Sequence, residues 1–319
     1  MTGRSIVGGA VGARGAWWTV LLAAALTRQA IIFRRYAAVL VKPIDITKTV
    51  EYKVVDWLAR NRPGERAMVS GDPEYIFNLF TDSPQLSAGH EPTAPNWIQQ
   101  IAVFIVYTGL GAGQHDAEVS IFWLKAFGVH TIYVPGPASR EHYHPIANPH
   151  KFDGLLPVLW HDEDDTIFAV PQRSGSMAHV IPREALVTRP PVHGLDLDPA
   201  RAYVAALDDP SLPLATLRWN SPSRAVIDTT MNPGQLISVQ ETWMPGWQAR
   251  ANGRSVRVFG DKLGLIVIDP ECGGSCHIDL FFGPTTEGWI LRFLSLMVTF
   301  LALVVLVVRK RAGSRPTKT

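Results

Sequence analysis

The sequence predicts an α+β protein with membrane helices, in which an α/β domain is followed by an antiparallel β-sandwich and a C-terminal transmembrane helix. Three observations predict this class. Residues 43–199 alternate helical and strand-like patterns, residues 200–287 carry short β runs between turn signals, and residues 288–308 are almost wholly apolar. A chain of 319 residues has room for two globular domains between its hydrophobic ends.

The N-terminal segment, residues 1–41, is hydrophobic but interrupted. Eighteen residues from Ala16 to Phe33 could cross a thin bilayer, although Arg28 lies within them. The same stretch could form an interfacial helix, or a signal peptide whose best cleavage site is Ala23–Ala25. We expect an anchor-like helix and leave open whether it spans the membrane.

The α/β domain is predicted for residues 43–199. Helical patterns follow Asp45 and recur at 75–80, 96–110 and 119–127. Strand patterns occur at 66–71, 130–136, 155–160, 166–170 and 177–181. Strands that alternate with helices indicate an α/β sheet.

The second domain is predicted for residues 200–287. No convincing helix follows residue 210 in this domain; six short β runs separated by turn signals indicate a β-sandwich. Asn252–Gly253 is typical of a type I′ hairpin. Cys272 and Cys276 flank Gly-Gly-Ser, so we expect a disulfide across a turn in an oxidising compartment; a free, inert pair is the alternative.

Residues 288–308 read GWILRFLSLMVTFLALVVLVV and form the predicted transmembrane helix. Twenty-one residues at about 1.5 Å each match the hydrocarbon core of about 30 Å. The basic tail, residues 309–319, begins with Arg-Lys-Arg and predicts a cytoplasmic C-terminus. The region before the helix is then extracytoplasmic.

The C-terminal third resembles the YfhO-like bacterial membrane proteins, which carry a Pro-Gly-Trp turn, an Asn-Gly turn and a strand that enters the last membrane helix. The residues that match this pattern are Pro245, Gly246, Trp247, Asn252, Gly253, Phe282 and Pro284. Upstream, FTDSPQLSAGH, WLKAFGVHTIYVPGP and KFDGLLPVLW are similar to membrane proteins described as 6-pyruvoyl-tetrahydropterin synthase-related. Together the two resemblances cover residues 43–308.

The resemblance implies a bacterial cytoplasmic membrane protein related to glycosyltransferases that use polyprenyl-phosphate sugars. Their catalytic residues lie in an N-terminal helix bundle without a counterpart here, so no catalytic residue is assigned. The pterin-synthase description transfers no activity, because that chemistry needs three converging histidines and a reactive cysteine. We expect this chain to be the exterior part of a larger polytopic protein.

Three residues of the second domain are candidates for contacting a glycan. Trp219 and Trp243 could stack on sugar rings, and Glu241 lies two residues before Trp243, on the same side of the strand. Trp247 is expected to fill the core instead.

Other groups of polar residues have simpler explanations. His142, His144 and His150 are expected in a solvated loop, and the acidic run 161–165 in a charged hairpin turn. Asp72, Glu74 and Asp82 could serve a hydrolase, but helix capping explains them as well. No phosphate-binding or nucleophile motif occurs, and a net charge of +2 indicates no nucleic-acid surface. We expect no cofactor and no metal.

These observations predict a non-catalytic extracytoplasmic region that contacts an envelope glycan or a lipid-linked sugar. The expected partners are the lipid bilayer, a polytopic transferase subunit, and a glycan or polyprenyl-linked sugar. The alternative is a stand-alone, membrane-anchored carbohydrate-binding module. An exported hydrolase that uses Asp72 or Asp82 is a third, less favoured class.

Overall fold

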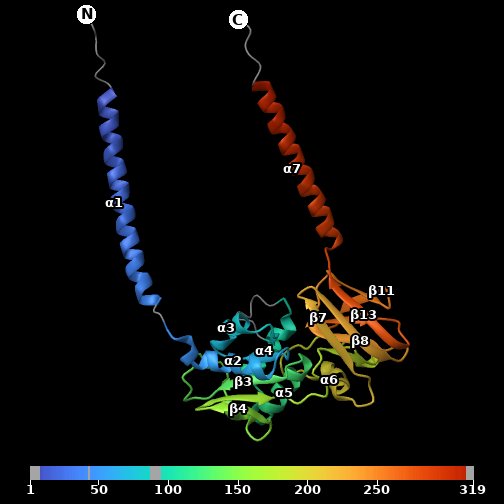
Figure 1. Cartoon of the computed structure of the whole chain (residues 1–319). Helices are drawn as coiled ribbons and strands as arrows, with labels where there is room; N and C mark the ends of the chain where they lie inside the picture. The colour runs from blue at the N-terminus through green and yellow to red at the C-terminus, as the bar shows by residue number, and fades with distance from the viewer. Residues whose placement is uncertain (1–7, 42–43, 87–94, 314–319) are drawn as a thin grey trace, which may run out of the picture. The chain divides into compact units, whose positions relative to one another are not determined.

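The computed structural model describes residues 8–41, 44–86 and 95–313 (Figure 1). The chain divides into two compact units, Met1–Thr49 and Val50–Thr319. The first unit contains helix α1 (Gly8–Leu40) and the 3-10 turn η1 (Ile46–Lys48). Helix α1 continues without a break through Arg28, and its described side chains are almost all exposed. The predicted N-terminal helix is therefore present, while its membrane crossing stays a prediction.

The second unit begins with a mixed five-stranded sheet in the order β2-β1-β3-β5-β4. Its first three strands are parallel, and β5 and β4 are added antiparallel. The α/β expectation therefore holds in part. The strands are β1 (Ala67–Val69), β2 (Gln85–Leu86), β3 (Thr131–Pro135), β4 (Val158–Asp162) and β5 (Asp165–Ala169).

Helices cover both faces of this sheet because its buried strands alternate their side chains between two cores. Ala67, Val69 and Tyr133 pack with α2 and α3, whereas Met68 and Ile132 pack with α4 and α5. The helices are α2 (Val50–Asn61), α3 (Pro73–Phe80), α4 (Trp97–Thr108) and α5 (Asp116–Ala126). All four predicted helical patterns are found.

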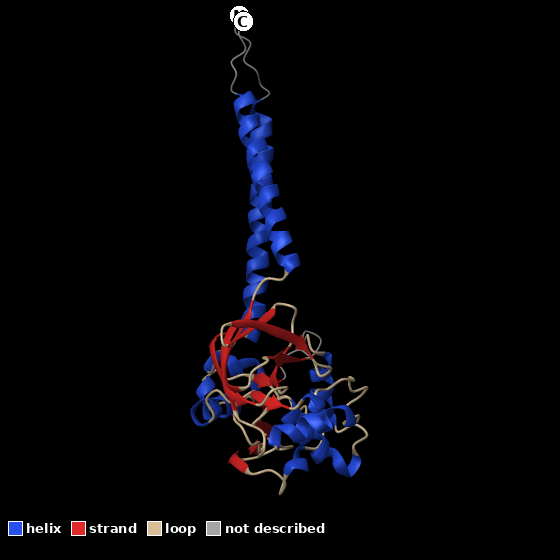
Figure 2. Cartoon of the chain, turned by 90° about the vertical axis from the view of Figure 1, so that its right-hand side faces the viewer, coloured by secondary structure: helices blue, strands red, loops and turns tan. Residues whose placement is uncertain are grey.

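The rest of the globular region is an antiparallel eight-stranded sheet, here called the barrel, in the order β6-β9-β12-β11-β10-β13-β8-β7. A β-bridge between His179 and Leu214, together with a hydrogen bond from Leu217 N to Ser176 Oγ (3.1 Å), joins the two ends of this order. Figure 2 shows its strands curving round in red. The strands are β6 (Ala178–Ile181), β7 (Ala215–Ser221), β8 (Arg224–Met231), β9 (Leu236–Thr242), β10 (Trp247–Ala251), β11 (Arg254–Gly260), β12 (Leu265–Asp269) and β13 (Gly274–Phe282).

Two barrel strands differ from the sequence analysis. Strand β6 was expected in the first sheet, but it pairs with β9. Strand β7 was not predicted, although Ala215, Leu217 and Trp219 alternate with polar residues; the apolar alternation is short, and of these three residues Ala215 alone is fully buried. Helix α6 (Arg201–Asp208) packs on the outer face of the barrel and shares a core with α4 and α5. That common core fixes the barrel against the first sheet.

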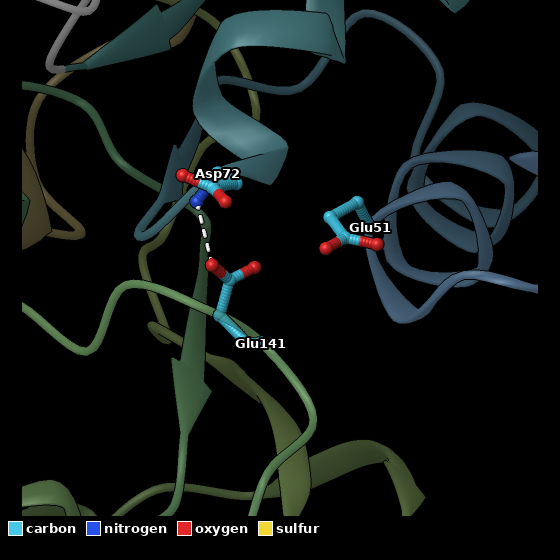
Figure 3. A group of neighbouring side chains, drawn as sticks. All are labelled: Glu51, Asp72 and Glu141. Atoms are coloured by element: carbon cyan, nitrogen blue, oxygen red, sulfur yellow. Dashed lines mark hydrogen bonds between the residues drawn. The ribbon is translucent and has the colours of Figure 1, made fainter. Parts of the chain in front are cut away.

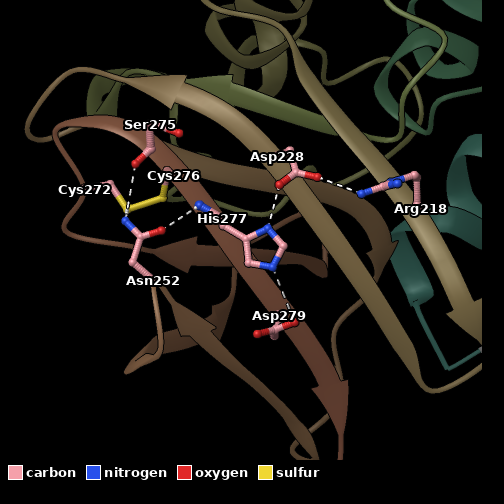
Figure 4. Close-up of polar contacts among 8 residues, drawn as sticks. All are labelled: Arg218, Asp228, Asn252, Cys272, Ser275, Cys276, His277 and Asp279. Atoms are coloured by element: carbon pink, nitrogen blue, oxygen red, sulfur yellow. Dashed lines mark hydrogen bonds and ion pairs between the residues drawn. A yellow bond between two sulfur atoms is a disulfide. The ribbon is translucent and has the colours of Figure 1, made fainter.

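The hairpins of the barrel follow the predicted turn chemistry. Asn252 and Gly253 both have positive φ, at 47° and 81°, as a type I′ turn requires. A disulfide joins Cys272 and Cys276 (Figure 4). Asn252 binds this second turn, since its amide donates to Ser275 O (3.3 Å) and its carbonyl accepts from His277 N (2.9 Å).

Strand β13 leads into α7 (Thr286–Gly313) through three residues. Within the described part of the chain, α7 is the one helix long and apolar enough to cross a membrane, over Thr286–Leu306. The hydroxyl of Thr299 donates to Ser295 O (2.8 Å), which satisfies it within the helix as an apolar solvent requires. The helix is compatible with membrane anchoring; the cytoplasmic position of the C-terminus stays a prediction.

Candidate functional site

The candidate site is an open groove of about 1020 Å³ at one end of the barrel. One wall comes from barrel residues where β7, β9, β10 and β13 begin or end, and the other from residues around α3 and α4. The lining residues are Asp82, Pro84, Pro95, Gln99, Met177, Trp219, Asn220, Ser221, Pro222, Ser223, Glu241, Thr242, Met244, Trp247 and Phe282. Apolar rings and a few polar groups are thus combined in one concave surface, as in ligand sites generally.

Three aromatic rings form the barrel wall of the groove. Trp219 and Trp247 have centroids 6.1 Å apart, and Trp247 and Phe282 have centroids 5.3 Å apart; both pairs meet edge to face. Trp219 is 38% exposed, so part of its ring is free to contact a ligand. Edge-to-face contacts hold the rings in place, because in each pair the positive edge of one ring meets the negative face of the other.

The Pro-Gly-Trp turn requires a glycine at position 246, because any side chain there would collide with Phe282. A Cβ atom at this position would lie 2.5 Å from the ring of Phe282. Gly246 also accepts a hydrogen bond from Gly283 N (2.9 Å), which fixes the end of β13 beside the start of β10. The turn therefore creates the space that Phe282 occupies in the groove wall.

Glu241 is the acidic group of the groove, and a buried arginine holds it. Arg66 Nη2 donates to Glu241 Oε2 at 2.8 Å, with the side chains 7% and 33% exposed. Arg66 Nη1 also donates to the backbone carbonyls of Phe127 (3.0 Å) and Gln240. One guanidinium group thus connects the first sheet, the end of α5 and β9, and its charge balances the carboxylate.

The opposite wall is fixed to the barrel by the N-terminus of α4. Asn96 caps this helix through its side-chain oxygen, which accepts from Ile98 N (3.0 Å). The Asn96 amide donates to Leu263 O (2.9 Å), in the turn before β12. Gln99, on the first turn of α4, is thereby held at the groove.

Of the three glycan-contact candidates predicted from the sequence, two lie in the groove and one does not. Trp219 and Glu241 line the groove, whereas the Trp243 ring packs against Gly260, where a Cβ atom would approach it to 2.9 Å. Trp247, expected in the core, lines the groove while also packing against the barrel interior. The geometry therefore favours Trp247 over Trp243 as the second aromatic group. The sequence signal for the groove position of Trp247 is its place directly after Gly246 in the Pro-Gly-Trp turn.

The acidic and histidine groups considered in the sequence lie apart. Asp82 lines the groove, Glu74 is buried beside the Tyr107 hydroxyl (3.5 Å), and Asp72 neighbours Glu51 and Glu141. His150 pairs with Asp153 (3.1 Å), and His144 contacts the backbone carbonyl of Glu141 (2.7 Å). Within residues 44–86 and 95–313, these histidines do not form a common metal-binding group. The acidic run makes the expected hairpin turn between β4 and β5.

No protein family, no curated protein and no solved structure matches this chain.

Proposed function

We propose that this chain is the non-catalytic extracytoplasmic region of a bacterial membrane protein related to polyprenyl-phosphate-sugar-dependent glycosyltransferases, and that its groove binds the sugar of a glycan or lipid carrier. One observation carries the proposal. Partly exposed Trp219 and the arginine-fixed carboxylate of Glu241 line the same groove. The proposal assigns recognition to this groove and assigns chemistry to a separate polytopic subunit.

A sugar suits this groove because its ring presents apolar C–H faces and a rim of hydroxyl groups. The exposed part of Trp219 offers an apolar face, while Glu241 Oε1 and the side chains of Asn220 and Gln99 offer hydrogen-bonding groups. Because Arg66 already fixes Glu241, little side-chain entropy is lost when a hydroxyl donates to it. A cavity of about 1020 Å³ has room for more than one sugar unit.

A ligand at the membrane surface is supported by the length of the connection to α7. Phe282 lines the groove, and α7 begins at Thr286. Four residues span at most about 14 Å. The groove therefore cannot lie far from the start of the apolar helix, which suits a sugar attached to a membrane lipid. The resemblance to YfhO-like proteins makes polyprenyl-phosphate sugars the first class to test.

The experiment measures binding of polyprenyl-phosphate sugars to the full chain in lipid nanodiscs. Wild-type protein should bind saturably, and Trp219→Ala should weaken binding at least tenfold. Trp243→Phe is the matched control, because this ring packs outside the groove, and it should bind like wild type. Equal binding by wild type and Trp219→Ala would remove the groove from the proposal, and glycosyl transfer by the purified chain alone would overturn its non-catalytic assignment.

A stand-alone carbohydrate-binding module is the second candidate, because Trp219 and the fixed Glu241 carboxylate in one open groove suit a soluble glycan as well as a lipid-linked sugar. It predicts binding of soluble envelope glycans without a lipid carrier. The transferase-related role instead predicts a multi-helix coding region beside this gene and co-purification with its product. A glycan array and a pull-down from solubilised membranes separate the two.

A further inference from the structure

A second site lies away from the groove, in the loop that follows β3. Glu141 is only 3% exposed, and its Oε1 atom accepts two backbone hydrogen bonds, from Asp72 N (2.9 Å) and Tyr143 N (2.8 Å). Gly71 makes room for this carboxylate: its φ is +78°, and a Cβ atom there would lie 2.9 Å from the carboxyl carbon of Glu141. The carboxylate is therefore held in one orientation.

The other oxygen, Glu141 Oε2, is buried and has no hydrogen-bond partner in the described parts of the chain. Figure 3 shows it on the side of the carboxylate that faces Glu51. An unpartnered carboxylate oxygen is costly to bury, so this position calls for a ligand or a proton.

Two more carboxylates meet Glu141 at this point. Glu51 projects from the first turn of α2, and Asp72 immediately precedes α3. One oxygen from each of the three side chains lies within 4.8 Å of the other two. Among the described residues, none of the three forms an ion pair with a basic side chain. Three acidic groups thus gather without a counter-charge from the described part of the chain.

We propose that Glu51, Asp72 and Glu141 bind a divalent cation, with Ca²⁺ as the preferred ion. Calcium takes oxygen ligands at about 2.3–2.6 Å, so two oxygens bound to one ion lie at most about 5 Å apart. The separations of the three oxygens fall within this limit. Calcium tolerates irregular geometry and completes its shell with water, which the half-buried positions of Glu51 and Asp72 permit, whereas Mg²⁺ demands a near-ideal octahedron.

The bound ion would connect three segments that are distant in the sequence. Glu51 lies in the first turn of α2, whose buried apolar residues pack against the first sheet, while Glu141 belongs to the loop after β3. An ion shared by these segments would hold the first turn of α2 against the loop that follows β3. The site is therefore structural, and it acts independently of sugar binding.

The test is a calcium titration of the thermal unfolding temperature of the full chain in detergent, after removal of metals with a chelator. Wild type should show a saturable rise with CaCl₂, with a midpoint in about the 10⁻⁴–10⁻³ M range typical of extracellular calcium modules. MgCl₂ should act only at a concentration at least tenfold higher. Glu141→Gln and Glu51→Gln should each move the calcium midpoint at least tenfold upward.

Glu118→Gln serves as the matched control, because this exposed carboxylate on α5 pairs with His115 outside the site, and it should titrate like wild type. If Glu141→Gln fails to fold, Glu51→Gln decides the question from its half-buried position. The proposal is overturned if wild type shows no saturable response to calcium, or if Glu51→Gln responds as wild type does. A response to magnesium at equal or lower concentration would overturn the preference for calcium.

Discussion

Glu241 in the groove and Glu141 beside β3 are both partly or wholly buried carboxylates, but they are satisfied in different ways. Glu241 has a permanent counter-charge, since Arg66 binds it from within the protein. Glu141 has two backbone donors on one oxygen and nothing described on the other. The carboxylate in the groove therefore has its partners before a ligand arrives, whereas the site formed by Glu51, Asp72 and Glu141 is completed by what binds there.

The largest expected effect follows from removing Arg66, the counter-charge of Glu241. Arg66→Ala should lower the free energy of unfolding by about 3–5 kcal/mol, because Glu241 loses its partner and the carbonyls of Phe127 and Gln240 lose a donor. Denaturant unfolding of the solubilised chain measures the change. Arg201→Ala, which breaks an exposed pair with Asp198, should cost less than about 1 kcal/mol. Similar losses in the two variants would show that Arg66 is not a central connection.

Buried His179 should make the stability of the chain depend on pH. His179 bonds to Gln240 Oε1 (2.9 Å), and burial lowers its pKa to about 4. Between pH 6.5 and 4 the unfolded chain binds a proton that the folded chain does not, so stability is complete above pH 6.5 and falls as the pH falls. The loss should reach about 3 kcal/mol near pH 4. His179→Gln should lack this loss. The difference in unfolding free energy between wild type and variant should therefore change between pH 6.5 and 4, and a difference that stays constant with pH would contradict the prediction.

Calcium should produce a smaller effect at the acidic site. At a free concentration ten times the dissociation constant, binding to the folded state adds about 1.4 kcal/mol. Glu141→Gln should remove most of this gain, whereas Trp219→Ala should keep it, because the groove and the acidic site share no residue. Thermal unfolding with and without calcium checks both variants. Loss of the calcium effect in Trp219→Ala would contradict their independence.

The smallest expected change concerns stability in the groove. Trp219→Ala should weaken sugar binding tenfold, about 1.4 kcal/mol, yet lower the free energy of unfolding by less than that, since the ring is 38% exposed. Calorimetric binding and unfolding measured on the same preparation compare the two quantities. A larger loss of stability than of binding energy would assign Trp219 to the core.

The sequence predicted the elements of the fold better than their partners. The four helical patterns of the first domain and the Asn252–Gly253 turn are found, because capping, period and turn chemistry are local. Strand β6 was assigned to the wrong sheet, because its pairing with β9 joins residues about sixty positions apart and leaves no local signal. Strand β7 was missed although Ala215, Leu217 and Trp219 alternate with polar residues, because the alternation covers only three apolar positions.

The candidate sites divide in the same way. Trp219 and Glu241 could be chosen by residue type, but the choice between Trp243 and Trp247 depended on which ring Gly260 or Phe282 contacts. The meeting of Glu51, Asp72 and Glu141 could not be predicted, because the three come from separate elements up to ninety residues apart. Only the tertiary fold brings such groups together.

The near-closure of the barrel also affects how copies of this chain behave when crowded on a surface. A free sheet edge exposes unpaired amide and carbonyl groups that recruit further strands, but β6 and β7 meet across the His179–Leu214 bridge. Among the described strands, the remaining edges are β2, only two residues long, and β4, which an irregular register and the charge of Asp162 interrupt. The fold thus offers neighbouring copies little opportunity for edge-to-edge aggregation.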